Sequence, residues 1–121
     1  MYFKRKENSE SLYSLTQIEA LAGSDATFVN EIVETFKTAT PNYLNQIKVA
    51  ILSNDFKAIH RAAHQLKPTM DIFAIVGAKE LVREIEKDAM QPNPNASKIE
   101  QDFNQLHEII TMVIEDLEIR L

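Results

Sequence analysis

The chain has 121 residues and a formal net charge of −5, with 45% apolar and 26% charged residues. This balance is typical of one globular domain, and no apolar run approaches the roughly 18 residues that cross a membrane. The acidic excess opposes nucleic-acid binding, and the absence of Cys excludes disulfides, thiolate nucleophiles and Cys-ligated metals. The charged start lacks the apolar segment of a secretory signal, so we expect a cytoplasmic protein without membrane or nucleic-acid partners.

The composition also favours helices, because only two Gly and four Pro are present, too few for many short strands. Residues 1–11 are expected to form a frayed N-terminal tail. A first short helix is predicted over residues 15–22, since Ser14 and Gln17 have the spacing of a capping box and Gly23 can end the helix in a left-handed conformation.

Two further helices are predicted on either side of Pro41. Ser24 is expected to cap the first, whose apolar stripe consists of Phe28, Val29, Ile32, Val33 and Phe36. Pro disfavours a helix interior but suits a first turn, so this helix should end near Ala39 and the next should begin behind Thr40. The next helix carries Leu44, Ile47, Ala50 and Ile51, and the two can resemble one kinked rod.

The remaining helices follow clear stop and start signals. Asp55 should cap a helix whose apolar stripe is Phe56, Ile59, Ala63, Leu66, Met70 and Phe73. Gly77 interrupts this pattern before a helix with Leu81, Val82 and Ile85, and residues 91–95 form a loop. Ser97 and Glu100 have capping-box spacing ahead of a long stripe made of Ile99, Phe103, Leu106, Ile110, Val113, Leu117 and Leu121.

These elements predict an all-α fold. The most economical arrangement is an up-down antiparallel four-helix bundle with a short additional N-terminal helix, in a single domain over residues 12–121. Phe28, Phe36, Phe73, Phe103 and Met70 are expected in its core.

The polar side of the 56–73 helix carries the candidate chemistry. At about 100° per residue, His64 lies roughly 130° from the centre of the apolar stripe and His60 roughly 90° from it, so His64 should face solvent. Lys57 and Arg61 fall on the same exposed side, and Lys67 lies one turn beyond His64. Together they form a local cationic face on an acidic protein.

An exposed neutral imidazole is a good nucleophile near pH 7, and a nearby Lys can offset the charge of an incoming phosphoryl group. The chain has no Gly-rich phosphate loop and no cluster of acidic metal ligands around His64. These residues therefore indicate a protein that accepts a phosphoryl group, rather than a kinase.

The segment Ala63-His64-Gln65-Leu66-Lys67-Pro68-Thr69, followed by Gly77-Ala78-Lys79-Glu80-Leu81, resembles the His-x-Leu-Lys signature of histidine phosphotransfer (HPt) domains. The front half also looks like such domains in its Gly-Ser-Asp turn, its Phe-Val-x-Glu-Ile stretch and its Thr-Pro junction. The resemblance extends over residues 12–121.

The resemblance implies a phosphocarrier, not an enzyme, in a two-component phosphorelay. His64 would be the phospho-acceptor and Lys67 the supporting lysine. The expected partners are response-regulator receiver domains and a hybrid sensor histidine kinase, contacted through His60, Arg61, Gln65, Pro68 and Asp71. The protein would be a monomer without a cofactor of its own, because the receiver would carry the Mg²⁺.

Two positions depart from the family pattern. Pro68 stands where Gly usually follows the lysine, and it removes one backbone N–H and its bond to the carbonyl of His64. The family glycine ten residues after the histidine corresponds to Ala74, whereas Gly77 lies thirteen residues after it. Either Ala replaces Gly, or the helix carries about one additional turn.

Two other functions compete with phosphotransfer. The bundle could be a non-catalytic interaction or adaptor domain, for which Pro68 and the displaced Gly77 are the best indications. The i, i+4 spacing of His60 and His64 can chelate zinc, but Asp71 is the sole nearby third ligand and no metal site is expected. His107 is expected to be a half-buried residue at the edge of the last helix.

Overall fold

The computed structural model describes residues 12–23 and 25–120. Its helices are α2 (Thr16–Ala22), α3 (Ala26–Leu52), α4 (Phe56–Ile72), α5 (Ala78–Ala89) and α6 (Ala96–Arg120), and the described residues include no strand. The predicted tail 1–11, together with Ser24 and Leu121, lies outside the described residues.

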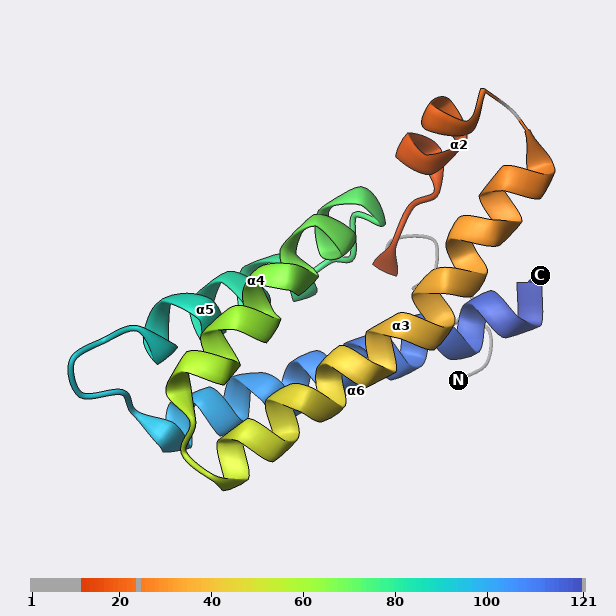
Figure 1. Ribbon diagram of the computed structural model, residues 1–121. Helices are drawn as coiled ribbons and strands as arrows, with labels where there is room; N and C mark the ends of the chain where they lie inside the picture. Colours follow the sequence, from red (N-terminus) through yellow and green to blue (C-terminus); the bar gives the residue numbers. More distant parts are fainter. Residues whose placement is uncertain (1–11, 24, 121) are drawn as a thin grey trace.

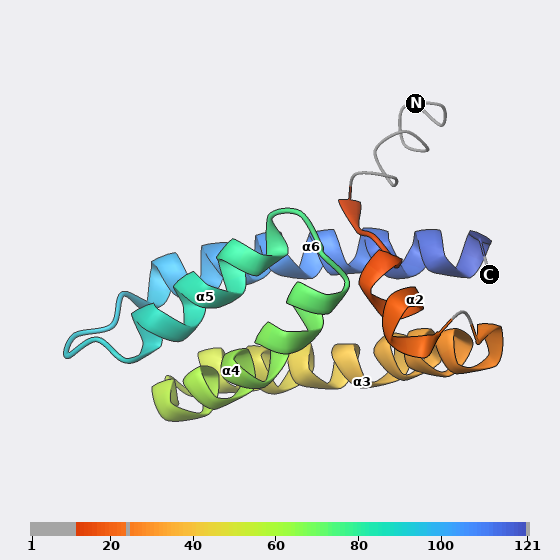
Figure 2. The ribbon, with the colours of Figure 1, turned by 90° about the horizontal axis from the view of Figure 1, so that it is seen from above.

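Helices α3 to α6 form an up-down antiparallel bundle, as predicted (Figure 1). Each of these helices packs against the next, and α3 also packs against α6, which closes the bundle. Helices α3 and α6 extend beyond α4 and α5, and the short α2 packs beside the first turns of α3 at that end (Figure 2).

The segment before α2 is fixed to the bundle by backbone hydrogen bonds. Ser14 N–H donates to the carbonyl of Phe73, and Val76 N–H donates to the carbonyl of Leu12. The Tyr13 hydroxyl donates to the carboxylate of Asp116 on α6. These contacts hold α2 against the turn between α4 and α5.

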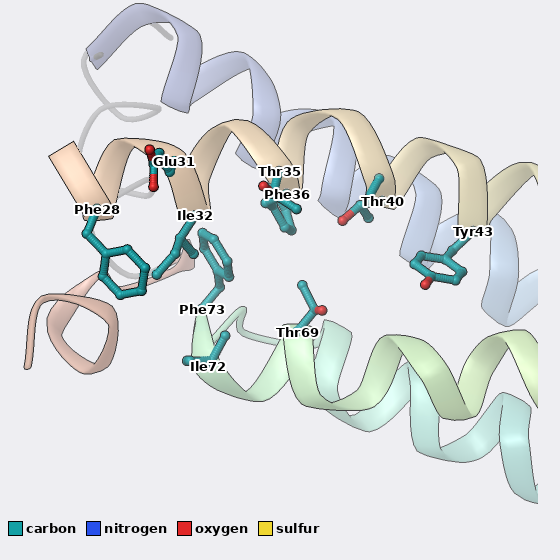
Figure 3. Close-up of a pocket in the computed structure, with 11 residues that line it drawn as sticks. Phe28, Glu31, Ile32, Thr35, Phe36, Thr40, Tyr43, Thr69, Ile72 and Phe73 are labelled. Carbon is teal, nitrogen blue, oxygen red and sulfur yellow. The ribbon is translucent and has the colours of Figure 1, made fainter. Parts of the chain in front are cut away.

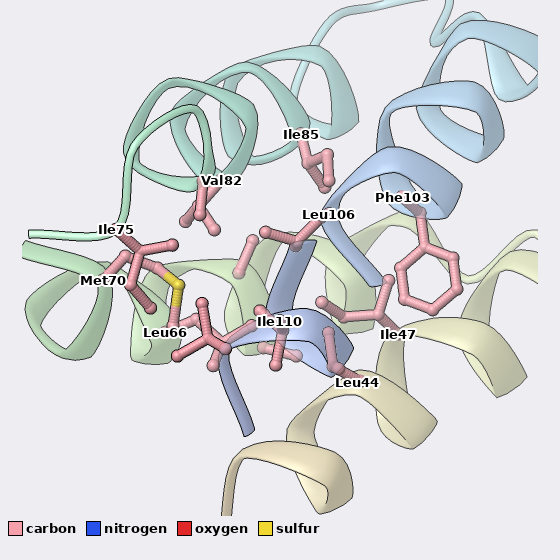
Figure 4. Close-up of a cluster of buried hydrophobic side chains, with 14 of the residues drawn as sticks. Leu44, Ile47, Leu66, Met70, Ile75, Val82, Ile85, Phe103, Leu106 and Ile110 are labelled. Carbon is pink, nitrogen blue, oxygen red and sulfur yellow. The ribbon is translucent and has the colours of Figure 1, made fainter. Parts of the chain in front are cut away.

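The core follows the predicted stripes (Figure 4). On α4, every predicted apolar position after Phe56 is buried, and Phe56 itself is partly buried. On α6, all predicted positions that the structure describes are buried. Met70 and Leu66 of α4 point toward Val82 of α5 and Ile110 of α6, so the helix that carries His64 is anchored by its opposite face.

The predicted break at Pro41 is wrong, because α3 continues through this residue for 27 residues. Thr40, predicted as an N-cap, lies inside the helix and is 2% exposed. The buried side chains repeat at three- and four-residue spacing on both sides of the proline, at Val33, Phe36, Thr40, Leu44 and Ile47. The continuous packing of this face outweighs the loss of one backbone hydrogen bond at the exposed Pro41.

Two caps differ from the predicted residues. Asp25, rather than Ser24, caps α3, since its carboxylate accepts from two backbone N–H groups in the first turn. Asn95, rather than Ser97, caps α6, since its side chain accepts from the N–H of Lys98. Asp55 caps α4 as predicted. In both wrong cases a carboxylate or amide within two residues of the predicted cap takes the role.

The capping box predicted for the first helix is also wrong. Leu15 occupies the cap position of α2 without a side-chain hydrogen bond, and Ser14 Oγ accepts from the N–H of Thr16 rather than pairing with Gln17. Gly23 ends α2 in the left-handed conformation, with φ of 61°, as predicted.

Two side chains are more exposed than predicted. Phe28 is 43% exposed because it lies in the first turn of α3, near the end of the bundle. His107 is exposed rather than half-buried, although its ring centroid lies 6.0 Å from that of Phe103.

The turn between α4 and α5 shows that Ala74 replaces the family glycine. Helix α4 ends at Ile72, so it carries no additional turn, and Ala74 adopts a left-handed conformation with φ of 49°. Ala74 therefore occupies a position that favours glycine. Gly77 has φ of 85° and precedes the first residue of α5.

Candidate functional site

His64 lies at the middle of α4, on the face opposite the buried stripe. Its side chain is 64% exposed, as predicted from the helix geometry. His60, one turn earlier, is half-buried. The buried residues Ile59, Ala63 and Leu66 fix the rotation of α4 and thereby place His64 at the surface.

The His64 ring contacts a carboxylate of the neighbouring helix. Its Nδ1 lies 2.6 Å from Oε2 of Glu86 on α5, and Nζ of Lys67 lies 2.9 Å from the other oxygen, Oε1, of the same carboxylate. The Glu86 side chain is only 14% exposed. We call this arrangement the Glu86 bridge.

Burial of Glu86 raises the pKa of its carboxyl. The hydrogen bonds and charges of Lys67 and His64 lower the pKa by a larger amount, so it lies below the ordinary value. The group is therefore a carboxylate at neutral pH. Since a carboxylate only accepts hydrogen bonds, Nδ1 of His64 carries the proton. In the neutral ring this leaves the lone pair on Nε2, directed away from the Glu86 bridge.

His60 is held in a similar way by the backbone. Its Nδ1 lies 3.1 Å from the carbonyl oxygen of Glu86, which fixes this nitrogen as the donor. The His60 and His64 rings are nearly parallel, with centroids 6.3 Å apart and an interplanar angle of 20°. Both imidazoles of α4 are thus oriented by one residue of α5.

The other predicted contact residues lie along the same helix. Arg61, Gln65 and Pro68 are exposed. Asp71 forms a bidentate pair with Arg83 of α5, at 3.0 and 2.8 Å. The hydrogen bonds and charge of this guanidinium hold the pKa of Asp71 below its ordinary value. Asp71 therefore joins α4 to α5 one turn beyond Lys67.

Two surface depressions lie along α4, and His64 lines the first of them. An open hollow of about 370 Å³ is lined by Lys57, His60, Arg61, His64 and Met90. A groove of about 350 Å³ runs between α3 and the end of α4, where Phe28 and Ile32 face Ile72 and Phe73 (Figure 3). Helical spacing places Gln65 and Pro68 between His64 and this groove.

Glu86 is the site residue that the sequence interpretation missed. It lies on the next helix, 22 residues after His64, and it follows the buried Ile85 like any polar residue of an amphipathic helix. No local motif marks it. The signal available in the sequence was the antiparallel pairing of α4 and α5, which brings one polar position of α5 opposite His64.

The described residues bring together no group of three or more His, Asp or Glu side chains able to hold a metal ion. In the same part of the chain, no helix combines the length and apolar character that a membrane crossing requires.

The fold and the site define a class: helical bundles that present an exposed histidine at the middle of one long helix, with its Nδ1 held by a carboxylate that a lysine also contacts. A family model described as the Hpt domain matches residues 31–117, and the chain belongs to this family. Hpt domains carry phosphoryl groups on histidine in two-component phosphorelays and interact with their receiver and kinase components. Searches of curated proteins and of solved structures found no match.

Proposed function

We propose that residues 12–121 act as one phosphocarrier unit in which His64 accepts a phosphoryl group from the aspartyl phosphate of a receiver domain and passes it to another receiver. The observation that supports this most directly is the exposed side chain of His64, whose Nδ1–H donates to Glu86 and leaves the Nε2 lone pair for a partner. The nucleophile is accessible to a partner and already in the required tautomer.

In the forward step, the Nε2 lone pair of His64 attacks phosphorus in line with the bond to the aspartate oxygen. A P–N bond forms, the P–O bond breaks, and the electron pair leaves with the aspartate carboxylate. The ring becomes cationic, and the Nδ1–H bond to the Glu86 carboxylate stabilises that charge. The reverse sequence returns the group to a second aspartate.

Lys67 is placed to support this transfer. Its ammonium lies one helical turn from His64, is 27% exposed, and is held by Glu86. It offsets charge on the phosphoryl oxygens without being required for the attack. The Mg²⁺ that supplies further charge neutralisation would be held by the receiver, so this chain needs no cofactor of its own.

The partner would dock across α4. The exposed Gln65 and Pro68 connect His64 to the apolar groove between α3 and α4, and Arg61 and His60 lie on the other side of the histidine. A patch of apolar surface beside a reactive group is typical of a protein interface. We expect Asp71 to border this interface, and we expect a cytoplasmic monomer that serves receivers and a hybrid sensor kinase.

The alternative function is an adaptor that has lost phosphotransfer. Its main support in the sequence was Pro68, yet α4 continues through Pro68 to Ile72, and His64 remains exposed. The geometry therefore favours the carrier.

The test is incubation with a ³²P-labelled receiver. Wild type and His60→Gln should acquire a label that is stable in base and lost in acid, whereas His64→Gln should acquire none. An exposed substitution of this kind changes stability by only about 0.5 kcal/mol, so the circular dichroism melt should be preserved. An unlabelled wild type with several competent receivers would favour the adaptor.

A further inference from the structure

The open hollow beside His64 carries positive charge that no ion pair within the fold uses. Its lining contains no carboxylate, although the chain has a formal net charge of −5. Within the described part of the chain, neither Lys57 nor Arg61 forms an ion pair, whereas Lys67 is paired with Glu86. We call this depression the cationic hollow, and its lining residues are Lys57, His60, Arg61, His64 and Met90.

The two cations also stand where they do not help α4 to form. Lys57 lies in the first turn of this helix, where the positive end of the helix dipole disfavours a cation. Arg61 follows four residues later, and like charges at this spacing repel one another. Both side chains are exposed, so neither is needed to cover the core. Their placement is better explained by a contact outside the chain.

Met90 adds an apolar surface to the same hollow. It ends α5 and is 59% exposed, one of the large apolar side chains that the fold leaves open to solvent. An exposed methionine beside positive charges is a combination found at protein interfaces, where Met and Arg are both enriched. The hollow therefore suits a partner surface that carries negative charge next to an apolar group.

We propose that the cationic hollow receives a surface carboxylate, an Asp or Glu, of the receiver, with an apolar side chain of the same receiver packed on Met90. This inference rests on the proposed function and adds the chemistry of one contact. The apolar groove between α3 and α4 lies on the other side of His64, toward the end of α4. Two contacts of different chemistry, one on each side, would fix how the receiver is rotated over His64.

A carboxylate held by a macromolecule fits this hollow better than a small free anion. The two cations are exposed, so water and salt screen them and a free anion would be held weakly. A receiver that already contacts His64 holds its own carboxylate there at a high effective concentration. Charged contacts of this kind favour one partner over another and speed association more than they add affinity. The hollow would thus select among receivers.

Calorimetric binding of an unphosphorylated receiver to the full chain, repeated at several ionic strengths, tests the proposal. Lys57→Glu should weaken binding by about threefold or more, and its combination with Arg61→Glu by about tenfold or more, with less dependence on salt. Lys57→Arg keeps the charge and should keep the affinity. Glu at position 57 suits the first turn of a helix, so the circular dichroism melt should be preserved.

Lys48→Glu is the matched control, because it makes the same change of net charge at an exposed lysine of α3 that lines a different depression. It should bind the receiver like wild type. An affinity unchanged in the double variant, or reduced as strongly by Lys48→Glu, would overturn the proposal, as would a wild type that binds none of several receivers. Charge-dependent binding without labelling of His64 would refute the proposed function and leave the docking contact in place.

Two further measurements identify the occupant. Among receiver variants with one surface Asp or Glu changed to Lys, one should bind wild type weakly and recover affinity with Lys57→Glu. If none does, the carboxylate contact is refuted. Titration of the chain alone with inorganic phosphate, followed by ¹⁵N NMR, should give no saturable shifts at Lys57 and Arg61. Saturable shifts that the double variant loses, with unchanged receiver affinity, would assign the hollow to a small anion instead.

Discussion

Removal of the Glu86 carboxylate should slow phosphoryl acceptance while leaving His64 exposed. The carboxylate accepts from Nδ1 of His64 at 2.6 Å and from Lys67 at 2.9 Å, so Glu86→Ala removes the partner of both groups. A hydrogen bond to a charged group contributes about 1.5–3 kcal/mol. If the ring loses this bond when it becomes cationic, acceptance should slow by about 10–100-fold, since about 1.4 kcal/mol corresponds to tenfold.

Glu86→Gln is the matched control because its amide oxygen still accepts from Nδ1 but carries no charge. It should retain ring orientation and lose charge stabilisation, so its rate should fall between those of wild type and Glu86→Ala. The assay is single-turnover transfer from a labelled receiver, with binding of the receiver measured separately. Wild-type rates in Glu86→Ala, at equal receiver affinity, would refute the role of the Glu86 bridge.

Further substitutions give expected outcomes that can be measured directly. Lys67→Ala should lower the transfer rate or the lifetime of phosphohistidine without abolishing labelling, and unchanged values for both would exclude a supporting role. Ala74→Gly should raise the free energy of unfolding by about 0.5–1 kcal/mol in urea titrations, because relief of about 1–2 kcal/mol of left-handed strain exceeds the added entropy of the unfolded chain. Gly77→Ala should lower it by about 1–2 kcal/mol, since φ is 85° and a Cβ would lie 3.3 Å from Ile109 Cδ1. The lowered pKa of Glu86 means that its ionised carboxylate stabilises the folded protein. This stabilisation is complete above pH 4.5, the ordinary pKa of Glu, and it is lost as the pH falls through the lowered pKa. The difference in free energy of unfolding between wild type and Glu86→Gln should therefore shrink in acid.

The sequence was sufficient to predict the parts of the fold that depend on apolar periodicity. The apolar stripes predicted nearly all of the buried residues of α4 and α6 correctly. The same periodicity predicted that His64 lies on the exposed face. Burial of the apolar stripe largely determines how a helix is rotated about its own axis. The buried and exposed faces can therefore be predicted without knowledge of the partner helices.

Helix starts and stops were predicted less reliably from local residues, and the structure shows why. Pro41 did not end α3 because apolar contacts on both sides of it hold one continuous helix. The caps at Asp25 and Asn95 were displaced by one or two residues, since several neighbouring polar side chains could serve and tertiary packing selects among them.

Glu86 marks the limit of interpretation from sequence. Its role depends on the register of α5 against α4, and that register is set by contacts such as those of Ile85 and Leu66 in the core. One residue earlier or later on α5 would point its side chain about 100° away. The family resemblance pointed to His64 and Lys67 but contained no information on this third group.

The Glu86 bridge also bears on how readily a phosphoryl group would leave His64. In the proposed transfer, phosphorylation of Nε2 leaves the proton on Nδ1, where the Glu86 carboxylate accepts it. When the P–N bond breaks in the next transfer, the electron pair returns to Nε2 and the ring departs as neutral imidazole. A neutral imidazole is a far better leaving group than an imidazolate anion. The contact that prepares His64 as a nucleophile would therefore also prepare it as a leaving group.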